Sequence, residues 1–104
     1  FKTLWMALNQ KNYREYISLQ DPAARKEMLD QLLRNNILSF YKGVDYWTNE
    51  KILTSVDAAP KRTRFKNQPM LAFTGHFTTN AVLPDYAGIG KSVARGFGTV
   101  MKIE

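Results

Sequence analysis

Two cations stand between two pairs of glycines near the end of the sequence. Lys91 and Arg95 are four residues apart, and the stretch around them, 88–98, reads GIGKSVARGFG and holds four of the chain's six glycines. Glycine adopts φ > 0 and lets a backbone approach another molecule closely, so this spacing predicts a turn-rich loop with exposed N–H groups. Backbone donors beside cationic side chains are typical of an anion site, and phosphates are the common biological polyanions.

This loop matches neither of the common nucleotide-binding motifs. A Walker A loop needs glycine at position 85, which is Asp85 here, and a dinucleotide fingerprint needs glycine at position 93, which is Val93. Two interpretations remain. The stretch is either a phosphate-contacting loop or a glycine-rich turn that only reverses the chain.

A second basic feature lies in the middle of the chain. The run PKRTRFK, 60–66, carries four positive charges around Phe65 and lies between Pro60 and Pro69. A charge run is usually a solvated loop, but a single sign and an aromatic residue favour contact with a phosphate backbone. We expect an exposed hairpin or arm whose cations are Lys61, Arg62, Arg64 and Lys66.

His76 is the one histidine of the sequence, and by default the one side chain that titrates near neutral pH. The spacing suggests no carboxylate pair or serine partner for it, and a lone histidine is more often structural than catalytic, so His76 is kept as a catalytic candidate without an assigned role. One histidine without cysteine does not make a zinc site. The sequence therefore leaves the catalytic residue unassigned, and we expect neither a metal nor a cofactor.

Composition places the chain among basic globular domains. It has 104 residues, of which 44% are hydrophobic, and a formal net charge of +6. This charge favours an acidic partner, with nucleic acid first and an anionic membrane surface second, unless it has no specific role. No apolar run approaches the ~20 residues of a membrane span. Without cysteines or a signal-peptide pattern, we expect a cytoplasmic protein and no membrane partner.

Periodicity predicts the elements that position these residues. The clearest is a long helix with Asp21 as N-cap, Pro22 in its first turn and an end near Gly43. We expect a short helix to start at Asn12, and strands over 1–8, 52–56, 70–78 and 99–104. This order predicts an α+β fold, a ferredoxin-like sandwich in which a four-stranded antiparallel sheet carries helices on one face.

The same helical and strand periodicities predict which side chains are buried and which are exposed. On strand 70–78, His76 lies opposite the phenylalanines, on a sheet face that we expect to be open to a partner. We expect the charged face of the long helix, which includes Asp30, to be solvated. The aromatic residues at its end are more often core than base-stacking platforms; they are Tyr41, Tyr46 and Trp47.

The string FTGHFTTNAVLPDYAGIGKSVARGFG, 73–98, resembles the C-terminal signature of the CRISPR-associated repeat-processing endoribonucleases of the RAMP superfamily. The likeness rests on the N-x-x-x-P segment, the glycine pairs and the cations between them. It implies ferredoxin-like domains, usually two in tandem. Residues 1–104 would then be a single RNA-binding domain, the C-terminal half of a longer protein. By the resemblance, the RNA-contacting loop would be formed by Gly88, Gly90, Lys91, Ser92, Arg95, Gly96 and Gly98.

The resemblance also implies an activity and partners. The parent protein would be a metal-independent endoribonuclease of antiviral defence that processes repeat RNA into guide RNAs, with its catalytic histidine in the N-terminal domain rather than at His76. The basic arm, 61–66, would help to grip the repeat. The expected partners are thus a CRISPR repeat stem-loop, an N-terminal domain of the same chain and other CRISPR-associated proteins.

Two alternatives stay open. One is a non-catalytic assembly protein whose glycine loop contacts a neighbouring subunit or the guide RNA. The other is a general binder of single-stranded nucleic acid that stacks bases on Phe65, Tyr86 and Phe97.

Overall fold

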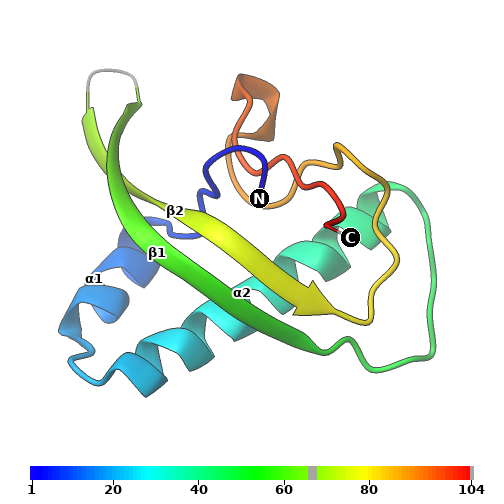
Figure 1. The fold of residues 1–104 in the computed structure, drawn as a ribbon, viewed down its shortest axis with the longest axis horizontal. Coiled ribbons are helices and arrows are strands. Elements are labelled where there is room, and N and C mark those ends of the chain that lie inside the picture. The colour runs from blue at the N-terminus through cyan, green and yellow to red at the C-terminus, as the bar shows by residue number, and fades with distance from the viewer. Residues whose placement is uncertain (66–67, 104) are drawn as a thin grey trace.

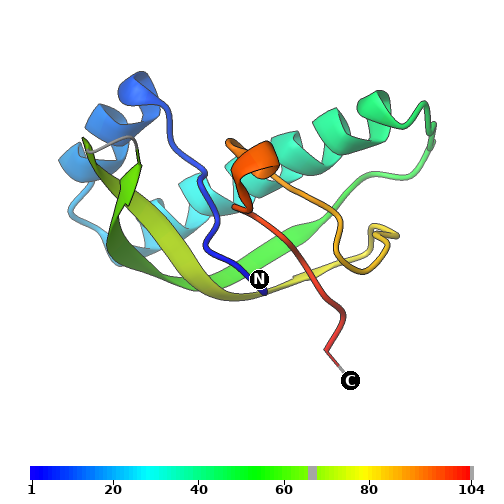
Figure 2. The ribbon, with the colours of Figure 1, turned by 90° about the horizontal axis from the view of Figure 1, so that it is seen from above.

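The computed structural model describes residues 1–65 and 68–103 of this α+β chain. Both helices lie on the same side of a long β-hairpin (Figure 2). The elements in chain order are α1 (Gln10–Ser18), α2 (Pro22–Gly43), β1 (Thr54–Phe65), β2 (Gln68–Thr79) and the 3-10 turn η1 (Val93–Arg95) (Figure 1).

The hairpin is one continuous antiparallel ladder. It runs from the Thr54–Thr79 pair to the Phe65–Gln68 pair without a bulge. Because side chains alternate between the two faces of a strand, Val56 shares one face with Phe73, and both are buried. His76 lies on the other face and is exposed, as expected from its parity.

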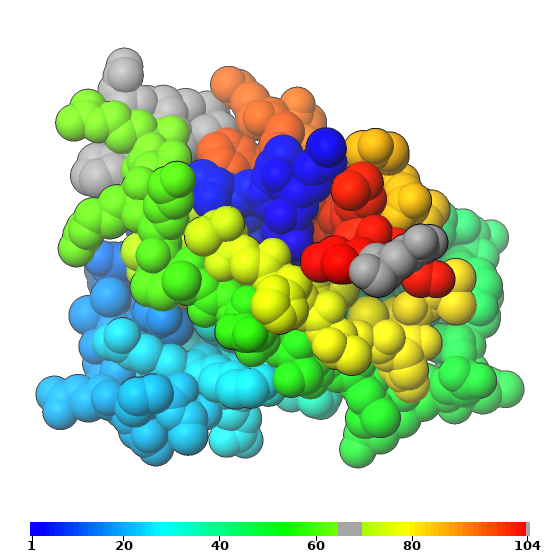
Figure 3. Space-filling view, viewed as in Figure 1, coloured from blue at the N-terminus to red at the C-terminus, as the bar shows by residue number. Residues whose placement is uncertain are grey.

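The expected four-stranded sheet is not formed, because β1 and β2 are the only strands among the described residues. The N-terminal segment runs beside β2 but joins it through a single bridge, Trp5 with Phe73. The C-terminal segment is likewise held by one bridge, Gly88 with Thr99. In Figure 3 the N-terminal segment (blue) lies between β2 (yellow) and the C-terminal segment (red), with the glycine loop (orange) above them.

Two glycines explain why the C-terminal segment does not continue as a regular strand. Gly90 has φ of 95° and Gly98 has φ of 72°, whereas strand residues have φ near −120° to −140°. Hydrogen bonds nevertheless join the layer across its width. The Gly98 N–H donates to the carbonyl of Leu4 (2.7 Å), and the Lys2 N–H donates to that of Thr99 (2.7 Å). Regular pairing is therefore replaced by a few bonds between irregular segments.

The long helix forms as its sequence predicts. The Asp21 side chain accepts the N–H of Ala23 (3.1 Å), Pro22 occupies the first turn, and the helix ends at Gly43. Every fourth residue from Leu29 to Tyr41 is buried, which makes one apolar stripe against the rest of the molecule. Neither described helix is both long and apolar enough to cross a membrane.

The short helix starts three residues earlier than expected. Asn9, not Asn12, is its N-cap, and the Asn9 side chain accepts the Asn12 N–H (2.8 Å). The aromatic residues at the end of α2 and just beyond it differ in burial. Tyr41 is buried, as expected of core, whereas Tyr46 is 50% exposed and Trp47 is 86% exposed.

Trp5 is the centre of the core. It is fully buried, its ring stacks on Phe1 at 5.0 Å between centroids, and it also contacts Phe73 at 5.9 Å. Its indole N–H donates to Oδ1 of Asn36 on α2 (3.0 Å). The N-terminal segment is thereby fixed to α2 and β2, and the glycine loop is packed against it.

Candidate functional site

The glycine loop, residues 88–98, is closed at its base by backbone hydrogen bonds. The Ile89 N–H donates to the carbonyl of Gly98 (2.9 Å), and Val100 donates to Ala87 (3.0 Å). Inside the loop, η1 follows Ser92, which itself adopts a left-handed conformation with φ of 59°. The loop therefore leaves and returns to the sheet layer at one place.

Glycines at the base of the loop are required by close packing. A Cβ on Gly90 would lie 2.8 Å from Nε1 of Trp5, and a Cβ on Gly98 would overlap the Ile89 carbonyl oxygen. Gly96 differs, because its φ of 90° is left-handed but no atom lies within 4 Å of an added Cβ. The loop is thus held directly against the buried tryptophan at its base, whereas its tip is open.

Several loop N–H groups are used inside the protein rather than presented to a ligand. The Lys91 N–H donates to the carbonyl of Met6 (3.0 Å). The N–H groups of Arg95 and Gly96 close η1, by donating to Ser92 and Val93. The expectation of an N–H cradle is wrong for these groups. These three N–H groups therefore do not help to bind an anion, although Lys91 and Arg95 can still attract one through their side chains.

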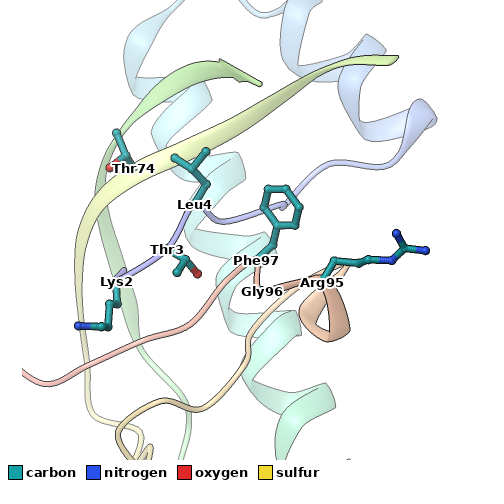
Figure 4. Close-up of a pocket in the computed structure, with 7 residues that line it drawn as sticks. All are labelled: Lys2, Thr3, Leu4, Thr74, Arg95, Gly96 and Phe97. Carbon is teal, nitrogen blue, oxygen red and sulfur yellow. The ribbon is translucent and has the colours of Figure 1, made fainter. Parts of the chain in front are cut away.

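Arg95 lines a hollow of 360 Å³. Lys2 is a second cation of this hollow, and the hydroxyl-bearing residues Thr3 and Thr74 also line it. Figure 4 shows the charged ends of Lys2 and Arg95 pointing in opposite directions, with Phe97 between them. A polyanion lying across this hollow would meet a positive charge at each side.

Lys91 lines a different hollow of 620 Å³, on the side of α1. Its cationic neighbours there are Lys11 and Arg14, and Asn9 and Gln10 complete the lining. The two cations of the glycine loop therefore serve separate hollows. In each hollow, the loop cation is joined by one or two cations from a segment far away in the sequence.

The basic arm is a strand end rather than a loop. Lys61, Arg62 and Arg64 all lie within β1 and are exposed. Alternation puts Arg62 and Arg64 on one face of the hairpin and Lys61 on the other. Lys66 and the side chain of Phe65 lie outside the described part of the structure. In Figure 1 this end of the hairpin and the glycine loop both project at the upper edge of the molecule.

His76 lies in neither cationic hollow. Its Nε2 is 3.2 Å from Oδ2 of Asp57, its partner across the hairpin, and both side chains are exposed. Within the described residues no group of three or more His, Cys, Asp and Glu side chains could hold a metal ion.

The two described residues that were expected to stack on bases, Tyr86 and Phe97, differ in exposure. Tyr86 is 63% exposed, and Nζ of Lys2 lies 5.7 Å from the centre of its ring. Phe97 is only partly exposed and lines the Arg95 hollow.

Sequence reasoning missed three cations of the site: Lys2, Lys11 and Arg14. Lys11 and Arg14 are three residues apart in the first turns of a helix, a spacing that puts both on one face. That spacing was available in the sequence. What the sequence does not show is that the same helix face meets Lys91, because the Asn9 cap and the Lys91–Met6 hydrogen bond fix that meeting.

Fold and site together define a small basic α+β domain with an anchored glycine loop between two cationic hollows. The chain belongs to the Cas6b C-terminal domain family, whose model matches residues 1–103. The resemblance of segment 73–98 to the C-terminal domain of CRISPR repeat-processing endoribonucleases is thereby confirmed.

Similar proteins extend this assignment. An uncharacterized protein of Methanocaldococcus jannaschii is 39% identical over 105 residues, which covers all of this chain and 71% of that protein. Two solved structures are each 45% identical over 99% of the chain. One is Cas6b, with a TM-score of 0.94, and the other is the CRISPR RNA processing endoribonuclease Cas6b, with a TM-score of 0.95. The chain spans 60% and 52% of the length of these two chains.

Proposed function

We propose that this chain is the RNA-binding domain of an endoribonuclease that processes CRISPR repeat RNA into guide RNAs. Its membership of the Cas6b C-terminal domain family supports the activity of the whole protein. The observation that carries the RNA-binding role is the glycine loop, whose two cations line separate hollows, Arg95 with one further cation and Lys91 with two. An extended polyanion can contact both hollows at once, which a small anion cannot do.

The anchored loop base suits this role energetically. Gly90 packs on the fully buried Trp5, and Gly98 packs on Ile89, so Lys91 and Arg95 project from a backbone that is already ordered. A preorganised site loses less conformational entropy when the ligand binds. Repeat RNA with a stem is gripped mainly through its phosphates and 2′-hydroxyls, which match cations and the hydroxyls of Thr3 and Thr74.

In this proposal the chain is one ferredoxin-like domain of a longer protein and holds the RNA without cutting it. RNA is cleaved when a 2′-hydroxyl attacks the adjacent phosphate with the help of a positioned acid and base. His76 faces Asp57 outside both cationic hollows, so we place that acid and base in another part of the protein. The shares of the solved Cas6b chains that this chain leaves uncovered are large enough for another domain.

The basic arm would add contacts to the phosphate backbone. Arg62 and Arg64 share a face of the hairpin, so they can touch one RNA strand together, whereas Lys61 points to the other face. We propose that the arginine pair makes this contact. Arg62→Gln/Arg64→Gln should therefore weaken binding and its salt dependence more than Lys61→Gln does, when compared by titrations at several salt concentrations.

The test of the proposed function is a fluorescence-anisotropy titration of a CRISPR repeat hairpin with Lys91→Glu/Arg95→Glu. The matched control is Lys42→Glu/Lys51→Glu, which changes the net charge equally at two exposed positions outside both hollows. We expect the loop variant to lose binding at least tenfold more than the control. We also expect the unaltered chain to bind less tightly as salt rises, with a slope set by the number of phosphate contacts.

Two results would overturn the proposal. The first is an unaltered chain that does not bind the hairpin at any salt concentration. The second is equal loss of affinity in the loop variant and the control, which would reduce binding to net charge. If the loop variant instead changed the association of the chain with other CRISPR-associated proteins, the assembly-protein alternative would take its place.

A further inference from the structure

We propose that the hollow between the start of α1 and the glycine loop is a separate phosphate-binding subsite, formed by Lys11, Arg14 and Lys91, for one phosphodiester of the bound RNA. This inference rests on the proposed function. It adds two residues of α1 to the RNA-binding surface and divides that surface into two sites that can be tested separately.

The first support is the meeting of three cations from two elements around one hollow of 620 Å³. Lys11 and Arg14 are on one face of α1, and Lys91 reaches the same hollow from the glycine loop. All three side chains belong to exposed residues, so a ligand can reach them without a change in the fold.

The second support is that no carboxylate neutralises this cluster. In the described part of the chain the ion pairs are Lys26–Asp30 and His76–Asp57, and neither involves the three cations. Glu15 lies one turn beyond Lys11 on α1 but does not line the hollow. Like charges brought together without a counter-charge repel one another, and a bound anion removes that repulsion.

The third support is that backbone hydrogen bonds fix both sides of the hollow. The Lys91 N–H donates to the carbonyl of Met6 (3.0 Å), and the chain then continues from Met6 into the Asn9 cap of α1. The distance between the backbones of Lys91 and Lys11 is therefore set by the fold. A subsite with a fixed spacing can select a phosphate at a fixed position along the RNA.

Two uncharged residues of the hollow suit the sugar beside that phosphate. The side-chain oxygen Oδ1 of Asn9 accepts the Asn12 N–H, so the side-chain NH2 group of Asn9 is left to donate to a hydroxyl. Gln10 supplies a second amide at the rim. A 2′-hydroxyl both donates and accepts hydrogen bonds, so these amides favour RNA over DNA in this subsite.

The test neutralises α1 alone, with Lys11→Gln/Arg14→Gln. Glutamine is a good helix former, so α1 should persist, and thermal unfolding is measured to confirm it. The control is Lys42→Gln/Lys51→Gln, which removes two charges from exposed positions outside the hollow. The probe is the CRISPR repeat hairpin, titrated at several salt concentrations, with a DNA hairpin of the same sequence in parallel.

We expect the α1 variant to bind the RNA hairpin about tenfold more weakly than the control. Because the variant weakens the contact with one phosphate, and each lost phosphate contact lowers the salt slope by about 0.7–0.9, the slope should fall by up to about 0.9. The preference for RNA over DNA should also shrink in Asn9→Ala. This variant is compared with Asn12→Ala, which leaves the cap side chain in place.

The outcomes separate this inference from the function on which it rests. If the unaltered chain binds the hairpin, Lys91→Glu/Arg95→Glu abolishes binding and the α1 variant matches its control in affinity and slope, the subsite is overturned and the function stands. If the unaltered chain binds no RNA, both are overturned. A folded α1 variant with reduced affinity and reduced slope supports the subsite.

Discussion

Trp5 is the residue on which the candidate site depends, because the base of the glycine loop packs against it. It is fully buried, donates to Asn36 on α2 and lies against the position of Gly90 in the glycine loop. One side chain thus joins a helix, the edge of the hairpin and the loop. Its loss should affect stability and the shape of the loop together.

We predict that Trp5→Ala lowers the free energy of unfolding by about 3–5 kcal/mol, because a large buried ring is replaced by a cavity. Trp47→Ala is the control, since Trp47 is 86% exposed and its loss should cost no more than about 0.5 kcal/mol. Urea unfolding monitored by far-UV circular dichroism measures both variants. Similar values for the two would show that Trp5 is not central to the core.

Replacing two glycines of the loop by alanine should destabilise the fold to different extents. Gly96→Ala should cost about 1 kcal/mol, because φ of 90° is unfavourable for alanine but the added methyl group meets no atom within 4 Å. Gly98→Ala adds an overlap with the Ile89 carbonyl oxygen and should cost about 1–3 kcal/mol more. Chemical denaturation of the two variants side by side checks the order. A reversed order would mean that the loop packs differently.

Among the elements, α2 both covers the hairpin and makes polar contacts with the edge of β1. Asp30, expected on a solvated face, accepts the N–H of Val56 at the edge of β1 (2.7 Å), and its backbone carbonyl accepts the hydroxyl of Thr54 (2.6 Å). Lys26 bridges the same carboxylate to Ser55. This polar contact sets the position of β1 along α2.

We predict that Asp30→Ala destabilises the fold by about 1–3 kcal/mol, because it leaves the Val56 N–H without its acceptor. Lys26→Ala should cost less than about 1 kcal/mol, since the Lys26 side chain of its ion pair with Asp30 is half exposed. Equilibrium unfolding of the two variants measures both losses of stability. A larger loss in the lysine variant would assign the contact to the ion pair rather than to the backbone acceptor.

Local rules were enough to predict α2, the alternation of β2 and the glycine loop. The Asp21–Pro22 start, the fourfold apolar spacing and the clustered glycines each act over a few residues. The Asn9 cap was missed because Asn12 and Glu15 offer an equally good capping pattern three residues later. The role of Asp30 depends on a strand 24 to 26 residues away, and no pattern in the helix reveals it.

At the scale of the whole molecule, the departure from four regular strands is what creates the site. Gly90 and Gly98 interrupt the pairing of the terminal segments, so the chain between them leaves the layer as a loop. Lys2, near the start of the N-terminal segment, then lines one hollow with Arg95, and Lys11, in the first turn of α1, lines the other with Lys91. The alternation of apolar and polar residues predicts strands but does not show where they are interrupted. The loop cations could therefore be predicted from the sequence, but not the cations that lie near them in the fold.

In the function that we propose, RNA lies on the glycine loop and on the start of α1. The most direct test maps backbone amide signals of the chain by NMR as the CRISPR repeat hairpin is added. We predict the largest shifts in residues 88–98 and 9–14, with little change at the exposed aromatic residues Tyr46 and Trp47. Shifts confined to the end of α2, with the glycine loop unchanged, would contradict this placement of the RNA.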